Sequence, residues 1–265
     1  MSKQRKLPKK LVWEFKTKIY DVERKSYQNS ERYVIREESY RIFINGKKFT
    51  SVMLVPEYEK EFFYGFLFTS QLIDSAKDIK SFRMCENKNA YVFLEEYKEF
   101  SFENKWTVTS GCGGGKVLEK TYDGFEKIET DFKVDADKII DMYKMLEKES
   151  YLHSHTRCVH KSYFLGKDGF VFTCEDIGRH NTIDKTIGAI MLNKRSYDGV
   201  ILTTGRLTSE MVLKCARAKI PIVVSRTAPS KMGIDIAKDA NVTLIGLTST
   251  KGFTVFTNDF RINFN

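Results

Sequence analysis

The first hundred residues alternate apolar and polar positions in short runs. YRIFI (residues 40–44) and FTSVMLV (49–55) flank the turn signal NGKK, a pattern that predicts a β-hairpin. The next run, EKEFFYGFLFTSQLI (59–73), has apolar residues at helical spacing, and AYVFLEE (90–96) is strand-like. We therefore predict a small α+β module in residues 1–105, preceded by a basic N-terminal tail.

From residue 134 onward, strand-like and helix-like runs alternate. DADKIIDMYKMLEKES (135–150) predicts an amphipathic helix with aspartate at its start. The runs after it alternate between the two kinds. The predicted strands are GFVFTCED, GVILTTG, PIVVS, VTLIGLT and finally FTVFT; the predicted helices between the first four are HNTIDKTIGAIMLN, TSEMVLKCARAK and PSKMGIDIAKDA. This order predicts βαβ units around a largely parallel sheet, and hence an α/β domain in residues 134–265. Residues 106–133 form the junction between the two halves.

Three turns that follow predicted strands are polar: CEDIGRHN (174–181), TTGRLTSE (203–210) and SRTAPS (225–230). Because ligands of α/β proteins collect at the carboxyl ends of the strands, we expect these turns to share one edge of the sheet. Helix N-termini and arginine side chains both suit phosphate groups. For any single turn, helix capping explains the serine and threonine equally well. Three such turns on one edge favour a binding site.

Each turn supplies candidate binding residues. They are Asp176, Arg179, His180 and Asn181 in the first turn, Gly205 and Arg206 in the second, and Arg226 in the third. We expect Thr208 or Ser209 to cap the helix after the second turn, and Pro229 to open the helix after the third.

The composition narrows the classes of partner. The 265 residues carry a formal net charge of +9, which favours an anionic partner. The lysines are scattered and no nucleic-acid-binding motif is recognisable, so we expect no nucleic-acid partner. No run reaches the roughly 18 apolar residues of a membrane span, and the basic start lacks an apolar signal core. We therefore expect a cytoplasmic protein with no membrane partner.

The cysteines and histidines do not predict a metal site. The five cysteines are spread along the sequence, which is poor spacing for either a disulfide framework or zinc. His155 and His160 have no second ligand pair, and the H-x-E with P-C-x-x-C signature of the zinc deaminases is absent. We expect structural or hydrogen-bonding roles for the histidines rather than metal ligation. His180 is the exception, because it shares a turn with Asp176 and Arg179.

One cysteine has an unusual setting. In SGCGGGK (110–116), Cys112 has glycine on both sides, so no neighbour in the sequence can bury it. The run is either an ordinary flexible turn or a loop that presents a sulfur atom. The thiolate is the reactive form of cysteine, and Lys116 or the arginine-rich edge would lower the pKa of the thiol.

Taken together, these motifs resemble the formate dehydrogenase accessory sulfurtransferases, the FdhD family, over most of the chain from about residue 34. The segments that carry the resemblance are EESYRIFINGK, GFLFTSQLI, SGCGGG, EDIGRHNTIDKTIG, TTGRLTSEMVLKCARAKIPIVVSRTAPS and GFTVFT. The resemblance implies a C-terminal α/β domain of cytidine deaminase-like fold without the deaminase zinc, beside the smaller N-terminal α+β domain. It also implies a cytoplasmic homodimer.

The activity that the resemblance implies is sulfur transfer. A cysteine desulfurase would supply sulfur, Cys112 would carry it as a persulfide, and the acceptor would be the molybdenum or tungsten bis(molybdopterin guanine dinucleotide) cofactor of formate dehydrogenase. A guanine nucleotide such as GDP would mimic part of that cofactor. The family's cofactor-contacting segment corresponds here to Leu247, Thr248, Ser249, Thr250, Lys251 and Gly252.

Two features depart from the family pattern. The second cysteine of the family's C-G-x-C-G loop falls at Gly115, and Cys158 stands where a small residue is expected; its replacing the missing cysteine is a hypothesis. The segment 247–252 lacks the expected arginines, and Lys251 is its one cation. The alternative function is therefore a chaperone that binds the molybdenum cofactor or a guanine nucleotide without sulfur chemistry. A hydrolytic deaminase is a third, more distant interpretation.

Overall fold

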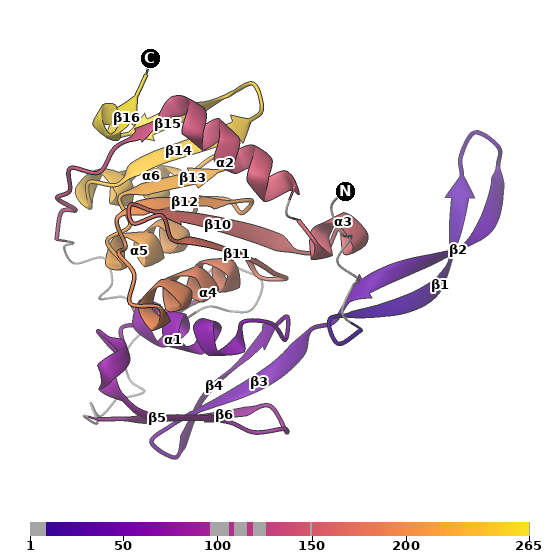
Figure 1. Ribbon diagram of the computed structural model, residues 1–265. Coiled ribbons are helices and arrows are strands. Elements are labelled where there is room, and N and C mark those ends of the chain that lie inside the picture. Colours follow the sequence, from indigo (N-terminus) through magenta and orange to yellow (C-terminus); the bar gives the residue numbers. More distant parts are fainter. Residues whose placement is uncertain (1–8, 96–105, 109–115, 119–125, 149, 265) are drawn as a thin grey trace.

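The computed structural model describes residues 9–95, 106–108, 116–118, 126–148 and 150–264 (Figure 1). It is a mixed α/β structure. A four-stranded sheet with one helix forms the N-terminal module, and a six-stranded sheet with helices on both faces forms the second. A two-stranded hairpin projects away from both.

The N-terminal module has the predicted hairpin and helix. Its strands are β3 (Glu38–Ile44), β4 (Lys47–Leu54), β5 (Ile79–Met84) and β6 (Asn89–Leu94), in the order β4-β3-β6-β5, with α1 (Glu59–Thr69) on one face and a 3₁₀ turn at Ala76–Asp78. The β3–β4 turn has positive φ at Asn45 and Gly46, as an Asn-Gly hairpin turn requires. The predicted hairpin, the helix after it and the strand near residues 90–96 are confirmed.

The projecting hairpin, called the arm below, consists of β1 (Val12–Asp21) and β2 (Ser26–Ile35). These two strands are not among the elements predicted from the sequence. Charged and hydroxyl residues stand on both faces of the hairpin, so no simple alternation marks a buried side.

The second module is built on a sheet of order β11-β10-β12-β13-β14-β15. Its strands are β10 (His160–Gly166), β11 (Val171–Asp176), β12 (Gly199–Thr203), β13 (Ile222–Ser225), β14 (Thr243–Ser249) and β15 (Gly252–Thr257). The prediction of a largely parallel sheet is corrected. β10 runs antiparallel to both its neighbours and β15 runs antiparallel to β14, so β11, β12, β13 and β14 are the strands that share a direction. β10 is likewise not among the strands predicted from the sequence.

Helices cover both faces of this sheet (Figure 1). They are α2 (Ala136–Lys148), α4 (Arg179–Leu192), α5 (Ser209–Arg217) and α6 (Lys231–Asp239), whereas the short helix α3 (Leu152–Thr156) packs against the base of the arm. α2 packs on one face through a cluster that includes Ile139 and Leu146, and α4, α5 and α6 pack on the other. Short pairs complete the fold: β7 (Trp106–Val108) with β8 (Lys116–Leu118), and β9 (Val134–Asp135) with β16 (Ile262–Asn263), which follows a 3₁₀ turn at Asp259–Arg261.

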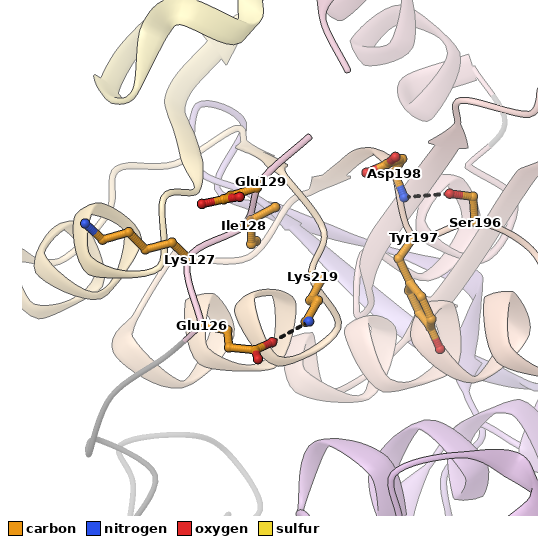
Figure 2. Close-up of a pocket in the computed structure, with 8 residues that line it drawn as sticks. All are labelled: Glu126, Lys127, Ile128, Glu129, Ser196, Tyr197, Asp198 and Lys219. Atoms are coloured by element: carbon orange, nitrogen blue, oxygen red, sulfur yellow. Dashed lines mark hydrogen bonds and ion pairs between the residues drawn. The ribbon is translucent and has the colours of Figure 1, made fainter. Parts of the chain in front are cut away.

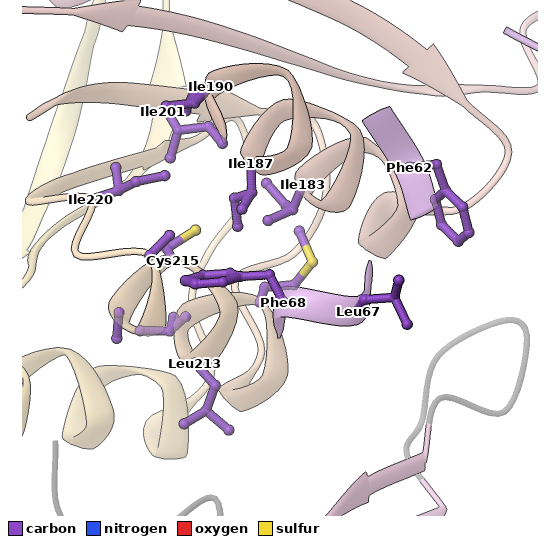
Figure 3. Packing of buried hydrophobic residues seen from close by; sticks show 14 of the residues in the cluster. Phe62, Leu67, Phe68, Ile183, Ile187, Ile190, Ile201, Leu213, Cys215 and Ile220 are labelled. Atoms are coloured by element: carbon purple, nitrogen blue, oxygen red, sulfur yellow. The ribbon is translucent and has the colours of Figure 1, made fainter. Parts of the chain in front are cut away.

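The two modules share one apolar core. Phe62, Leu67 and Phe68 of α1 belong to the same buried cluster as Ile183 and Ile187 of α4 (Figure 3). A Cβ at Gly65 would lie 1.8 Å from the backbone oxygen of Asp184, and one at Gly188 would lie 1.8 Å from that of Glu61. The two helices can approach this closely because both crossing positions are glycine.

None of the helices in the described part of the chain is long and apolar enough to cross a membrane.

Candidate functional site

The carboxyl ends of β11, β12, β13 and β14 lie at one edge of the sheet, called the rim below. Main-chain hydrogen bonds tie its turns together. The Arg226 amide donates to the Thr203 oxygen (3.1 Å), the Ser230 amide to the Leu207 oxygen (3.0 Å), and the Leu247 amide to the Thr227 oxygen (3.2 Å). These bonds place the second and third turns beside one another and beside the 247–252 segment, and the close contact of Gly205 with Arg179 sets the first turn against the second.

Asp176 is the anchor of the first turn. Its side chain is fully buried, and its two carboxylate oxygens accept from the Val55 amide (3.0 Å), the Gly178 amide (3.0 Å) and the Asn181 side chain (2.7 Å). The Lys185 ammonium lies 2.6 Å away. A carboxylate with this many donors shapes the turn and holds the end of β4 against it, so we assign Asp176 a positioning role.

Asn181 has a similar role. Its amide nitrogen donates to Asp176 and also to the Met53 oxygen at 2.8 Å. The N-terminal module therefore contributes directly to the shape of the rim.

Arg179 and Gly205 are in close contact across two neighbouring turns. A Cβ at Gly205 would lie 2.7 Å from the Cβ of Arg179, so the second turn passes over the arginine stem only because residue 205 is glycine. The Gly205 oxygen accepts from the Ser225 hydroxyl at 2.7 Å, which ties this turn to β13. Arg179 is 6% exposed, so its stem is packed into the rim.

His180 is held neutral. Its Nε2 lies 3.3 Å from a carboxylate oxygen of Glu210 at the start of α5. Burial, followed by the positive charges of Lys214 and Arg179, lowers the pKa of His180 to about 3. At neutral pH the imidazole is therefore neutral and not a cation, and it packs α4 beside Glu210 at the start of α5.

His160 also belongs to the rim. It begins β10 directly opposite Asp176, and its Nδ1 lies 3.4 Å from the Thr204 hydroxyl. Burial lowers the pKa of His160, and the nearby charges of Arg179 and Arg206 lower it further. The contact with Thr204 agrees with the structural or hydrogen-bonding role expected of this histidine. The missed strand β10 is the reason its place at the rim was not recognised.

The arginines of the rim differ in exposure. The side chains of Arg206 and Arg226 face solvent, and an Arg226 nitrogen lies 3.9 Å from a Glu147 oxygen at the end of α2. That Glu147 oxygen is also 3.3 Å from the ammonium of Lys161, which is 1% exposed. Arg206 and Arg226 are thus the rim arginines best placed to meet an anion from solvent.

The helix caps at the rim differ from expectation. Thr208 is the N-cap residue of α5 but makes no side-chain capping bond. α6 begins at Lys231, and its N-cap Ser230 accepts from the Gly233 amide at 3.1 Å. Pro229 therefore precedes the cap and does not open the helix. The prediction is wrong by two residues because the Ser230 hydroxyl caps the helix by accepting from a free amide, which makes Lys231 the first helical residue.

The segment 247–252 forms a tight β14–β15 hairpin. Leu247 has a positive φ of 54° and is exposed, whereas Thr248 is buried. The Lys251 amide donates to the Ser249 hydroxyl at 3.2 Å, and the lysine side chain is exposed. Thr250 and Lys251 form the tip, and Gly252 begins β15. The hairpin stands at the end of the rim next to the third turn.

Cys112 and Gly115 lie outside the described residues. Of the other cysteines, Cys158 is exposed, while Cys174 and Cys215 are buried. Burial raises the pKa of Cys174 to about 11 and that of Cys215 to about 12, which makes both thiols unreactive. In the described part of the chain, no group of three or more potential ligands could hold a metal ion.

A separate hollow of about 660 Å³ lies at the opposite edge of the sheet, near the starts of β12 and β13 (Figure 2). Its lining mixes both charges, and Lys219 pairs with Glu126 at 2.6 Å. This hollow is distinct from the rim and shares none of its candidate residues.

The fold and the rim together define a mixed α/β protein whose candidate site is built from turns at the carboxyl ends of its parallel strands. Comparison with known proteins then places it more closely. The model of the FdhD/NarQ family matches residues 35–263, and the chain belongs to this family.

Several proteins with known names are similar to the chain. A protein of Wolinella succinogenes named sulfur carrier protein FdhD is 34% identical over 88% of this chain and 83% of its own length. One of Sulfolobus acidocaldarius with the same name is 30% identical over 94% of this chain and 98% of its own length. The crystal structure of a protein from Desulfotalea psychrophila, described as a formate dehydrogenase accessory protein, superposes with a TM-score of 0.81 at 30% identity, covering 96% of this chain and all of that one.

Proposed function

We propose that this protein is a sulfur carrier that serves the maturation of formate dehydrogenase. The observation that carries the proposal is membership of the FdhD/NarQ family, together with similarity to relatives named sulfur carrier proteins along most of the chain. The structure related to it is described as that of a formate dehydrogenase accessory protein, which supports the same pathway. A sulfurtransferase activity of this kind needs one accessible thiol, and Cys112 in its glycine-rich run is our candidate.

The loading step is a transfer of sulfane sulfur from a cysteine desulfurase. The Cys112 thiolate attacks the outer sulfur of the donor's persulfide, a new sulfur–sulfur bond forms, and the donor cysteine leaves as a thiolate. This reaction uses one cysteine on the carrier, so glycine at position 115 does not block it. Whether Cys158 serves as a second thiol is tested by peptide mapping after mild oxidation: a Cys112–Cys158 disulfide supports that role.

The sulfur acceptor in this proposal is the bis(molybdopterin guanine dinucleotide) cofactor with molybdenum or tungsten, bound as a substrate. The rim suits such an anionic ligand. Arg206 and Arg226 face solvent, and the N-termini of α5 and α6 present backbone amides beside them. A guanine nucleotide would occupy part of the site, with Lys251 adding positive charge at its end.

In the proposed site, the buried residues position the exposed ones. Asp176, Asn181 and Gly205 set the path of the turns, the Arg179 stem fills the space between them, and neutral His180 packs α4 beside the start of α5. We also propose the cytidine deaminase-like fold for the α/β domain, without a zinc site, and a cytoplasmic homodimer.

A chaperone that binds the cofactor but performs no sulfur chemistry is the second candidate, and Gly115 in place of the family's second cysteine favours it. The first experiment is mass spectrometry of the protein after incubation with a cysteine desulfurase and cysteine. A gain of one sulfur on the Cys112 peptide, absent from Cys112→Ala and present in Cys158→Ser, supports the carrier. No gain at Cys112, with guanine nucleotide still bound, supports the chaperone.

A further inference from the structure

The arm is the part of the described structure with the least internal support (Figure 1). Only its base is packed: Leu11, Val12 and Ile35 join a small cluster with Leu152 and Val159. Beyond the base, the arm is a ribbon of two strands, each ten residues long. A two-stranded ribbon by itself is marginally stable in water, because a third strand or a packed face is needed to bury its side chains.

Apolar side chains nevertheless concentrate on the arm. Of the seventeen large apolar side chains exposed in the described structure, seven lie there. Trp13 and Phe15 are 55% and 53% exposed, and they stand on one face of the ribbon, since Trp13 pairs with Val34 and residues two apart share a face. Exposed aromatic residues in a row mark a surface that another chain covers.

The outer edge of β1 is open as well. Within the described residues, β1 pairs with β2 alone, so the backbone groups along its other edge are available to a further strand. An exposed edge of this kind is completed when an extended segment adds to it.

We propose that a second copy of this chain covers the arm, with β1 pairing antiparallel to β1 of the other copy about a two-fold axis at Phe15. Such pairing places Phe15 opposite Phe15, Trp13 opposite Thr17, and Glu14 opposite Lys16. The edge is therefore complementary to itself in both apolar character and charge, as a two-fold interface requires. This proposal rests on the homodimer put forward above and identifies the surface that forms it.

Other registers of β1 are less favourable. An axis at Lys16 sets two lysines directly opposite each other, and an axis at Thr17 sets Lys16 opposite Lys18. Like charges directly across a ladder are destabilising. Along β2, an axis at Glu31 pairs two carboxylates, and one at Ser30 faces no opposite charges. The Phe15 register brings opposite charges together without a repulsive pair.

The pairing would also fix the two rims relative to each other. The cluster at the base of the arm includes Ile177, which lies between Asp176 and the start of α4. The arm is thus attached to the first turn of the rim, so joining two arms sets the spacing of the two sites.

The test measures the mass of the full-length protein in solution by sedimentation across a concentration series. Glu14→Lys places lysine opposite Lys16 of the other copy. We expect the dissociation constant of the dimer to rise by about tenfold or more. Glu23→Lys makes the same charge change at the exposed turn of the arm, outside the paired segment, and should leave the dimer unchanged. A Glu14→Lys dimer as tight as the wild type overturns the proposal.

A second variant tests the register directly. Phe15→Cys should form a disulfide between equivalent residues of two copies on mild oxidation, because directly opposed residues have the required separation. Tyr20 is 62% exposed, more than Phe15, but Tyr20→Cys should give no such link. Linking of the Tyr20→Cys variant in preference to Phe15→Cys, or of neither variant, would reject this pairing. A monomeric wild type would reject the homodimer as well, while sulfur loading of Cys112 tests the carrier function independently.

Discussion

The crossing of α1 and α4 is the contact on which the union of the two modules depends, and Gly188→Ala perturbs it with one methyl group. The new Cβ would lie 1.8 Å from the Glu61 oxygen, whereas ordinary contact begins at 3.4 Å. The helices would have to separate by about 1.6 Å, the difference between these distances. Because the obstructing atom belongs to the backbone, no side-chain rotation can relieve the clash.

The expected cost follows from this geometry. Overpacking a core costs about 1–3 kcal/mol, and a rigid backbone neighbour places this site near the upper end. Alanine in place of glycine returns up to about 1 kcal/mol through helix propensity. The net loss of unfolding free energy is therefore about 2 kcal/mol, which lowers the melting temperature by roughly 4–8 °C in a protein of this size.

Thermal melts followed by circular dichroism measure this effect. Lys138→Ala, at an exposed position of α2, serves as a control for alanine in a helix with no new contact. Gly65→Ala should repeat the loss, since its Cβ meets the Asp184 oxygen at the same distance. If Gly188→Ala melts at or above the wild-type temperature, the close crossing does not join the modules as described.

Three further perturbations test the rim. Asp176→Asn leaves the buried Lys185 without its counter-charge and should cost about 3–5 kcal/mol of unfolding free energy, measured by urea denaturation; a loss below about 1 kcal/mol would speak against the anchoring role. His180 has a folded-state pKa of about 3 and an ordinary value of 6.5, so the unfolded chain binds its proton first and stability should be lost as pH falls from 6.5 toward 3. His180→Gln should flatten that pH dependence, and an unchanged slope would contradict the assignment. Arg206→Ala should weaken GDP binding about tenfold by calorimetry, and Lys167→Ala, at the other end of β10, should not; equal effects would point to net charge alone.

Local patterns were sufficient for much of the fold. The Asn-Gly pair between two apolar runs predicts a hairpin. Asn and Gly accept the positive φ angles of a tight two-residue turn, and that turn matches the right-handed twist of the two strands. The helix of residues 59–69 and the alternating elements after residue 134 follow from helical and strand periodicity. The prediction that three polar turns meet at one edge also held, since strands of one direction end at one edge.

β10 and the two strands of the arm lack such local signals. β10 is buried on both faces and includes the charged residue Lys161, which is 1% exposed. Hydrogen bonds from its ammonium to the Leu146 oxygen and to Glu147 compensate for the burial of the charge. Its antiparallel direction depends on the strands beside it, which no local pattern encodes. The arm was missed because its faces are exposed and mixed in polarity.

The sequence by itself determined the class of fold, the family resemblance, the thiol at Cys112 and the set of arginines that could meet an anion, because each depends on residue type and on spacing within one segment. Only the tertiary structure distinguished the buried, anchoring role of Asp176 from the exposed position of Arg206. It also placed Gly65 against the backbone of α4 and brought the Val55 amide to the rim. These depend on contacts between residues far apart in the chain. Burial and the approach of two backbones are properties of the packed molecule, and no single segment carries them.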